Sequence, residues 1–238
     1  MLPPICWAGS RLGWRGAEWF MRDMPIDMVR LALVLLAFAS IAAFLFGLAE
    51  DHETLRLVSK PIPVIVLLLA VAQRGTGPLM WGVVTGLALS AVGDVLLELG
   101  HFVPGLGAFL AAHVAYFLAF SWDRWAPKLL RGVPPFAYGL LILGVIGAGL
   151  GDLFAPVLAY LVVLCAMLWR AAARIRLPIP SGAQVAGLVG AVLFTLSDTV
   201  IAIDRFTAFE HSATRYVIIG TYWVGQLGIA LSVDRTSD

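Results

Sequence analysis

Eight long apolar segments limit the folds open to this chain more than any other feature of its sequence. A helix needs about 20 apolar residues to cross a bilayer. Charged residues make up only 13% of the chain, against about 25% in soluble proteins. The sequence therefore predicts an all-α fold, a polytopic membrane bundle of eight transmembrane helices with short connections and antiparallel neighbours. The expected spans are residues 29–49, 57–73, 79–98, 103–121, 134–150, 153–173, 183–203 and 214–233.

We expect residues 25–238 to form this single transmembrane domain and residues 1–24 to form a disordered or interfacial extension, because they lack the apolar core of a signal peptide. Cytoplasmic loops carry an excess of Lys and Arg. Twelve of the 16 basic residues lie near the two termini or in the loops after helices two, four and six. Both termini are therefore expected in the cytoplasm, and the Arg-, Ala- and Gly-rich composition favours a multi-pass protein of a bacterial inner membrane.

Two aspartates lie deep inside apolar segments in matching settings. Asp94 and Asp198 each follow a Gly by eight residues and precede a Phe by eight residues. A carboxylate at bilayer depth is costly, so it usually faces a cavity or a partner and marks a function. The offset of 104 residues between the settings is consistent with a four-plus-four internal repeat or with the general likeness of membrane segments. Two such carboxylates suggest paired acid–base chemistry or ion coupling, and the alternative is a purely structural role.

Other polar side chains in these segments have two interpretations each. Glu98 lies one turn beyond Asp94 on the same helix face, or simply reaches interfacial water. His113 has a near-neutral pKa that suits proton transfer, or it is a hydrogen-bonded packing residue. Lys60, before Pro61, either snorkels to the interface or binds a phosphate group.

In the last segment, Tyr222 and Gln226 lie one turn apart. They either join helices by hydrogen bonds or line a site. Trp223 is expected with other tryptophans in an interfacial belt.

The residue types present exclude several chemistries. A zinc hydrolase needs about three converging ligands, and His113 is the one credible intramembrane histidine, which leaves only a His-Asp-Asp set. The nucleophile motif of serine hydrolases and the glycine-rich nucleotide loops are missing, and Gly93-Asp94 lacks the preceding glycine of the intramembrane aspartyl proteases. Two desolvated carboxyl groups instead suit acid–base hydrolysis by water, which needs no metal or cofactor. We expect no nucleic-acid partner.

At these residues the chain resembles the lysoplasmalogenase (YhhN-like) family of integral membrane hydrolases. The resemblance covers helices two to four and seven to eight, and the N-terminal extension falls outside it. The matching motifs are Ser59-Lys60-Pro61, Gly93-Asp94-Val95, Phe109 through His113 to Tyr116, Phe194-x-x-Ser197-Asp198 with Ala202 and Phe206, and Tyr222-x-x-x-Gln226.

This resemblance implies hydrolysis of the vinyl ether bond of lysoplasmalogens to a fatty aldehyde and a glycerophospho-headgroup. Asp94 and Asp198 would be catalytic, and the substrate would be a lysophospholipid presented among membrane lipids. The runner-up interpretation is a proton-coupled transporter that uses the same aspartates, and a third is a lipid-binding scaffold. The sequence leaves open the headgroup, which aspartate is the acid, and the oligomeric state. The expected substrate-binding residues are Lys60, His113, Tyr116, Ser197, Tyr222 and Gln226.

Overall fold

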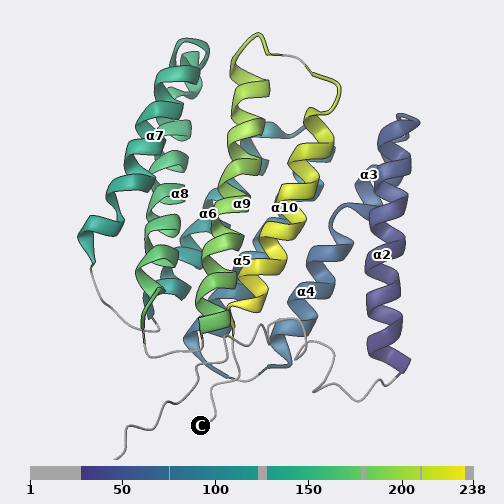
Figure 1. Cartoon of the computed structure of the whole chain (residues 1–238). Helices are drawn as coiled ribbons and strands as arrows, with labels where there is room; N and C mark the ends of the chain where they lie inside the picture. The colour runs from purple at the N-terminus through teal and green to yellow at the C-terminus, as the bar shows by residue number, and fades with distance from the viewer. Residues whose placement is uncertain (1–27, 75, 123–127, 178–180, 210, 234–238) are drawn as a thin grey trace, which may run out of the picture.

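A computed structural model describes residues 28–74, 76–122, 128–177, 181–209 and 211–233, so the expected extension over residues 1–24 lies outside the described residues. The described chain is a bundle of helices (Figure 1). Short 3-10 turns at Leu129–Arg131, Gly147–Gly149 and Gly151–Leu153 flank α7 and α8. The α-helices are α2 (Met28–Ala49), α3 (Glu53–Ser59), α4 (Ile62–Ala72), α5 (Pro78–Glu98), α6 (Phe102–Trp122), α7 (Val133–Ile146), α8 (Phe154–Arg174), α9 (Ser181–Phe206) and α10 (Thr214–Leu231).

These helices confirm the all-α prediction and lie close to the expected segments, and the chain is a multi-pass membrane protein. Seven stretches of the described chain are long and apolar enough to cross a membrane, with α3 and α4 counted as one. The eighth, α10, has 18 residues and includes Arg215 and Gln226, which lower its hydropathy. The described chain begins in α2 and ends after α10 at the same lower end of the bundle in Figure 1, which is compatible with eight spans, a count that stays a prediction.

Glycines allow the closest helix contacts around the centre of the bundle. A Cβ atom on Gly190 of α9 would lie 2.5 Å from the backbone nitrogen of Ile229 and 2.7 Å from the carbonyl oxygen of Gly225, both in α10. In α5, a Cβ on Gly93 would lie 2.6 Å from the ring of Phe109 in α6. Small residues let membrane helices approach at backbone distance, so the α5–α6 and α9–α10 pairs are tightly packed beside the two aspartates.

The second span is broken at its prolines. Helix α3 ends at Ser59 and α4 begins at Ile62. Pro61 and Pro63 carry no N–H, so the carbonyls four residues before them lose their usual helical donors. The indole N–H of Trp223 in α10 lies 3.4 Å from the carbonyl oxygen of Lys60. Trp223 is buried against Phe44, so its expected place in an interfacial belt is wrong.

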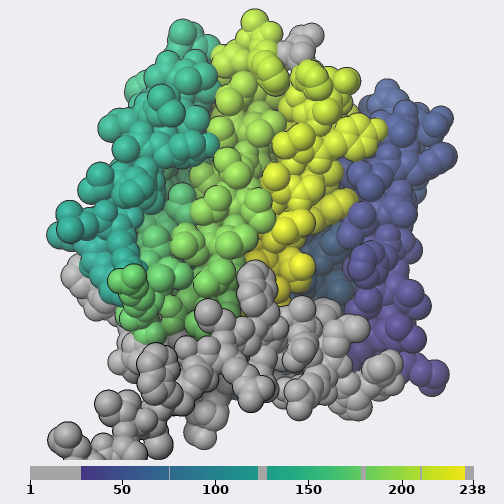
Figure 2. Space-filling view, in the orientation of Figure 1, coloured from purple at the N-terminus to yellow at the C-terminus, as the bar shows by residue number. Residues whose placement is uncertain are grey.

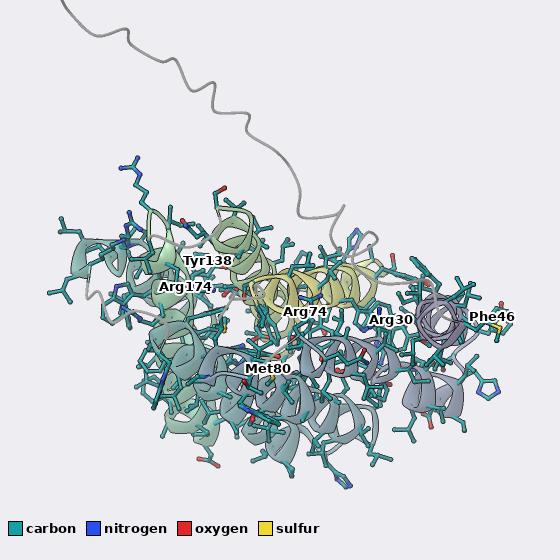
Figure 3. All side chains as sticks on the ribbon, turned by 90° about the horizontal axis from the view of Figure 1, so that it is seen from below. Arg30, Phe46, Arg74, Met80, Tyr138 and Arg174 are labelled. Atoms are coloured by element: carbon teal, nitrogen blue, oxygen red, sulfur yellow. The ribbon has the colours of Figure 1, made fainter. Side chains whose placement is uncertain are left out.

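Basic side chains at the lower end bind the C-terminal carbonyls of helices. Arg74 donates to the carbonyl oxygens of Ala230 and Val233 at 2.9 and 3.3 Å, where α10 ends. Arg131 donates to the carbonyl oxygens of Ala172 and Ile175 at the end of α8. Seen from below in Figure 3, Arg174, Arg74 and Arg30 lie across this end of the bundle. Cations at helix C-termini complement the helix dipole, so these residues stabilise the fold directly.

The outward faces of the helices are apolar. Large exposed apolar side chains include Phe38, Leu140, Leu141, Val189 and Val224. Figure 2 shows the face of the molecule formed by α7, α9, α10 and α2. A surface of this kind suits contact with lipid tails.

Candidate active site

Asp94 is buried in the middle of the bundle and is held by side chains from two other helices. Its carboxyl group is 1% exposed. The hydroxyl of Tyr222 in α10 donates to Asp94 Oδ2 at 2.7 Å. The Lys60 ammonium, at the break between α3 and α4, lies 3.9 Å from Asp94 Oδ1. Burial disfavours the charged form of Asp94, whereas the hydroxyl donor and the nearby cation both favour the carboxylate and offset part of that cost.

Asp198 is held by a different set of side chains, from α6 and α8. The hydroxyl of Tyr160 donates to Asp198 Oδ2 at 2.7 Å, and His113 Nε2 lies 3.4 Å from the same oxygen. His113 Nδ1 lies 2.6 Å from the carbonyl oxygen of Phe109. A carbonyl can only accept, so Nδ1 carries a hydrogen and a neutral ring presents a lone pair at Nε2. Two acceptors would then face each other, and Nε2 is buried with no hydrogen-bond partner among the described residues, so this contact favours a protonated, neutral Asp198.

Aromatic rings separate these two groups. The ring of Phe194 lies 5.3 Å from that of Tyr222 and 4.7 Å from that of His113, measured between centroids. Phe109 packs against both Phe194 and Tyr222. The two carboxyl groups therefore lie in separate polar groups on either side of a small aromatic cluster. Asp94 belongs to the tightly packed α5–α6 pair and contacts α10, whereas Asp198 belongs to the α9–α10 pair and contacts α6. This crossed arrangement is compatible with the internal repeat, which stays a prediction.

The other sequence-predicted residues are divided between site and packing positions. Tyr116 of α6 donates to Gln226 Oε1 at 2.7 Å, and both side chains are fully buried. Gln226 lies one helical turn after Tyr222 in α10. This pair extends the Asp94 group deeper into the bundle. Ser197 instead donates to the carbonyl oxygen of Ile218 at 3.0 Å, a contact that joins α9 to α10. The structure thus brings Lys60, Tyr222, Tyr116 and Gln226 to the Asp94 side and His113 to the Asp198 side.

A mixed ion cluster lies beside Asp94 at the upper end of the bundle. We call Asp51, Arg56, Lys60 and Glu98 the outer ion cluster. The Glu98 carboxylate lies 3.0 Å from Lys60 Nζ and 3.5 Å from Arg56 Nε and accepts a hydrogen bond from each. Arg56 also binds Asp51 at 2.9 Å. Glu98 is only 9% exposed, so it lies inside the protein rather than at free interfacial water, and its position one turn beyond Asp94 puts both carboxylates on Lys60.

An apolar cavity lies beside Asp198, between α5, α6, α8 and α9. Its volume is about 60 Å³, several times the roughly 10–15 Å³ that one water molecule needs. The titratable side chains in its wall are Asp198 and Tyr160, and the apolar wall includes Phe109, Ala202 and Phe206. The cavity can hold a few water molecules or the reacting end of a substrate, whereas a whole lipid chain would need further space between helices.

Two residues of these groups were not expected from the sequence. Tyr160 is an isolated hydroxyl in an apolar segment, and only the fold shows that it meets Asp198. Arg56 lies on the side that is poor in basic residues, a signal that could have marked it. Within the part of the chain that the structure describes, no three His, Cys, Asp or Glu side chains converge as metal ligands.

Comparisons with known proteins find one family model and several relatives that match this chain. The model of the family described as the YhhN family matches residues 55–233, which include both aspartates, Lys60 and Gln226. The Homo sapiens protein named Lysoplasmalogenase TMEM86B is 41% identical over 154 residues, or 63% of this chain and 62% of that protein. The Bos taurus protein named Lysoplasmalogenase TMEM86A is 32% identical over 190 residues, or 73% and 75%.

A bacterial relative gives a similar match. The Mycobacterium bovis protein named Lysoplasmalogenase is 34% identical over 166 residues, which are 65% of this chain and 61% of that protein. The chain therefore spans about three fifths of the human and mycobacterial proteins it matches. No solved structure matches it.

Proposed function

The chain belongs to the YhhN family, and from that premise we propose that it hydrolyses the vinyl ether bond of lysoplasmalogens. The products would be a fatty aldehyde and a glycerophospho-headgroup. The names of its relatives support this reaction. The single observation that carries the proposal is that Asp198, 10% exposed, lies in the wall of an apolar cavity with the unpartnered Nε2 of His113 3.4 Å from its Oδ2.

We assign the general acid to Asp198. Vinyl ether hydrolysis begins when a proton is added to the β-carbon, which is an apolar position on the lipid. Asp198 lies in the wall of an apolar cavity, and apolar surroundings together with the lone pair of His113 Nε2 favour its protonated form. Transfer of that proton leaves a carboxylate, and the Tyr160 hydroxyl already points at its Oδ2. Charge-assisted hydrogen bonds are stronger than neutral ones, so Tyr160 stabilises Asp198 as it loses the proton.

We assign the second role to Asp94. Its contacts with Tyr222 and Lys60 favour a carboxylate, which can stabilise the oxocarbenium ion and take a proton from the attacking water. Phe109 lines the cavity and packs on Tyr222, so its ring stands between the cavity and the Asp94 group. The assignment therefore requires the Phe109 ring to move aside when the substrate enters.

The proton balance closes over the two carboxyl groups. In the first step the π electron pair of the double bond forms a C–H bond between the β-carbon and the proton of Asp198. The resulting cation is stabilised by a lone pair of the ether oxygen as an oxocarbenium ion. Water then forms a C–O bond, and its proton passes to Asp94, which gives a hemiacetal. In the collapse, Asp198 takes the hemiacetal proton while Asp94 protonates the departing glycerol oxygen. Both groups return to their starting states.

The charge distribution supports a substrate that enters from the outer side. The arginine-rich lower end of the bundle is the expected cytoplasmic end, and both termini would lie there. Lys60 and the outer ion cluster lie at the opposite end. An ammonium group is a suitable partner for phosphate. We therefore propose that Lys60 binds the lysophospholipid phosphate at the outer face of a bacterial inner membrane.

Aldehyde release tests the proposal. The purified chain in dodecyl maltoside is given a lysoplasmenylethanolamine, and aldehyde is measured by mass spectrometry. In heavy water, the mechanism places one deuterium on the carbon next to the aldehyde group. Loss of a general acid or base costs about 10²–10⁴-fold, so we expect Asp94→Asn and Asp198→Asn to lose at least the lower figure.

The matched control is Asp204→Asn, six residues after Asp198 on the same helix and exposed, which should keep its activity. Size-exclusion chromatography checks that each variant is folded. Retained activity in both buried variants would refute the mechanism. A folded wild-type protein that releases no aldehyde, but takes up solute into vesicles along a proton gradient, would replace it with the transporter.

A further inference from the structure

We propose that Glu98 binds the ammonium group of a zwitterionic headgroup while Lys60 binds its phosphate, so that this pair selects ethanolamine and choline lysolipids over anionic ones. The inference rests on the proposed function, because it places the headgroup of that substrate at the outer ion cluster. Its basis is the way Lys60 is shared. Lys60 Nζ is 3.0 Å from Glu98 and 3.9 Å from Asp94.

The four side chains of the outer ion cluster carry no net charge by themselves, and the Asp94 carboxyl group lies next to them, 3.9 Å from Lys60. Arg56 and Lys60 supply two positive charges, and Glu98 and Asp51 supply two negative charges. Arg56 is held in place, because it binds Asp51, Glu98 and the carbonyl oxygen of Gly47 in α2. Lys60 has only carboxylate partners at these distances and stands on a helix break. Lys60 is therefore the cation that an incoming phosphate can engage.

A phosphate on Lys60 competes with Glu98 for the same ammonium. Glu98 is 9% exposed and would keep only the 3.5 Å contact with Arg56. A buried carboxylate that loses its partner is strongly unfavourable. A headgroup that carries its own cation, one ethyl linker from the phosphate, restores the balance by placing that cation on Glu98. A glycerol headgroup carries none and leaves Glu98 short of charge.

The local backbone adds to this preference. Pro61 and Pro63 leave the carbonyls of Leu57 and Ser59 without their usual helical donors, and both belong to the same end of α3. A helix C-terminus carries partial negative charge. The end of α3 therefore favours a cation near Lys60 and Glu98. Lys60 and Glu98 are 12% and 9% exposed, so a headgroup bound to them is itself largely removed from water.

Binding of lipids that cannot be hydrolysed tests the inference independently of catalysis. The full chain in dodecyl maltoside is titrated with three 1-O-hexadecyl lysolipids, which carry phosphoethanolamine, phosphocholine or phosphoglycerol. Tryptophan fluorescence reports binding, since Trp223 contacts the Lys60 backbone. We expect the wild type to bind both zwitterionic lipids about tenfold tighter than the glycerol lipid, which equals about 1.4 kcal/mol.

The Glu98→Gln variant should bind all three lipids within about threefold of one another, mainly through weaker binding of the zwitterions. Glu98→Asp keeps the charge and should keep the order of preference. Glu53→Gln is the matched control, because Glu53 is an exposed carboxylate in the first turn of α3 and lies outside the outer ion cluster, and it should behave like the wild type.

Equal binding of the three lipids by the wild type would overturn the inference, as would a folded Glu98→Gln protein that keeps the preference. Should Glu98→Gln fail to fold, the wild-type preference and the Glu98→Asp variant still decide. The two proposals fail separately. A chain that prefers the zwitterions but releases no aldehyde refutes only the proposed hydrolysis, and a chain that hydrolyses without headgroup preference refutes only the role of Glu98.

Discussion

Replacement of Tyr160 by Phe is the sharpest single test of the Asp198 group. The change removes one hydroxyl that donates to Asp198 Oδ2 at 2.7 Å and leaves the ring against His113. Asp198 then keeps only the longer contact of 3.4 Å with His113. In the proposed first step Asp198 changes from acid to carboxylate, so the lost hydrogen bond is stronger in the transition state than in the ground state.

A hydrogen bond to a charged group contributes about 1.5–3 kcal/mol, and each 1.36 kcal/mol changes a rate about tenfold. A neutral hydrogen bond contributes about 0.5–1.5 kcal/mol, and kcat responds only to the difference of about 1–1.5 kcal/mol between the charged and neutral bonds, so we expect kcat for aldehyde release to fall by about 5- to 15-fold. KM should stay near the wild-type value, because Tyr160 acts on the acid and not on the headgroup. A purely structural role would not produce this separation of kcat from KM.

The matched control is Tyr138→Phe. Tyr138 Oη lies 2.8 Å from the hydroxyl oxygen of Thr199, the residue after Asp198. Its removal deletes a similar hydroxyl next to the site without touching the carboxyl group, so kcat should stay within about twofold of the wild type. The reasoning fails if Tyr160→Phe keeps wild-type kcat, or if Tyr138→Phe loses as much as Tyr160→Phe.

Three further changes test the cavity and the bundle. Ala202→Phe places a ring in the cavity wall beside Asp198 and should lower kcat/KM at least about tenfold by excluding the reacting end of the substrate; unchanged kinetics would show that the substrate does not use this cavity. Gly190→Ala places a methyl group against the α10 backbone and should destabilise the protein by about 1–3 kcal/mol, measured as a lower melting temperature in detergent. Gly220→Ala, with open space around its Cβ, should not change the melting temperature. Arg74→Gln removes the bonds to Ala230 and Val233 and should destabilise the protein by about 1.5–3 kcal/mol; equal loss in the exposed Arg176→Gln control would refute the helix-capping role.

The sequence predicts the helices well because membrane insertion is governed by segment length and hydropathy, which are local properties. The ends of α5 and α6 lie within a residue or so of their expected positions. The weak second segment also behaves as its prolines require, since the missing N–H groups break it between Ser59 and Ile62. Trp223 is the exception. An indole suits an interface in general, but a partner on Lys60 and packing on Phe44 hold it inside.

The site is predicted only as a set of residue types, because its geometry depends on contacts between distant segments. Nothing in one sequence shows that Tyr222 reaches Asp94 across 128 positions, or that Tyr160 rather than Ser197 binds Asp198. The adjacent hydroxyl of Ser197 is the natural guess for a partner of Asp198. In the helix it points toward α10 instead, because neighbouring residues on a helix face in different directions.

Exceptions to the charge asymmetry carry more information about the site than the asymmetry itself. Basic residues at the arginine-rich end have two sufficient explanations, orientation in the membrane and the capping of α8 and α10 by Arg131 and Arg74. Arg56 and Lys60 lie at the opposite end, where neither explanation applies, and both bind Glu98. A cation retained on the side that is poor in positive charge needs a local partner, and here the partners are carboxylates at and beside Asp94. Two of the four basic residues on this side, Arg56 and Lys60, therefore mark the headgroup end of the proposed active site.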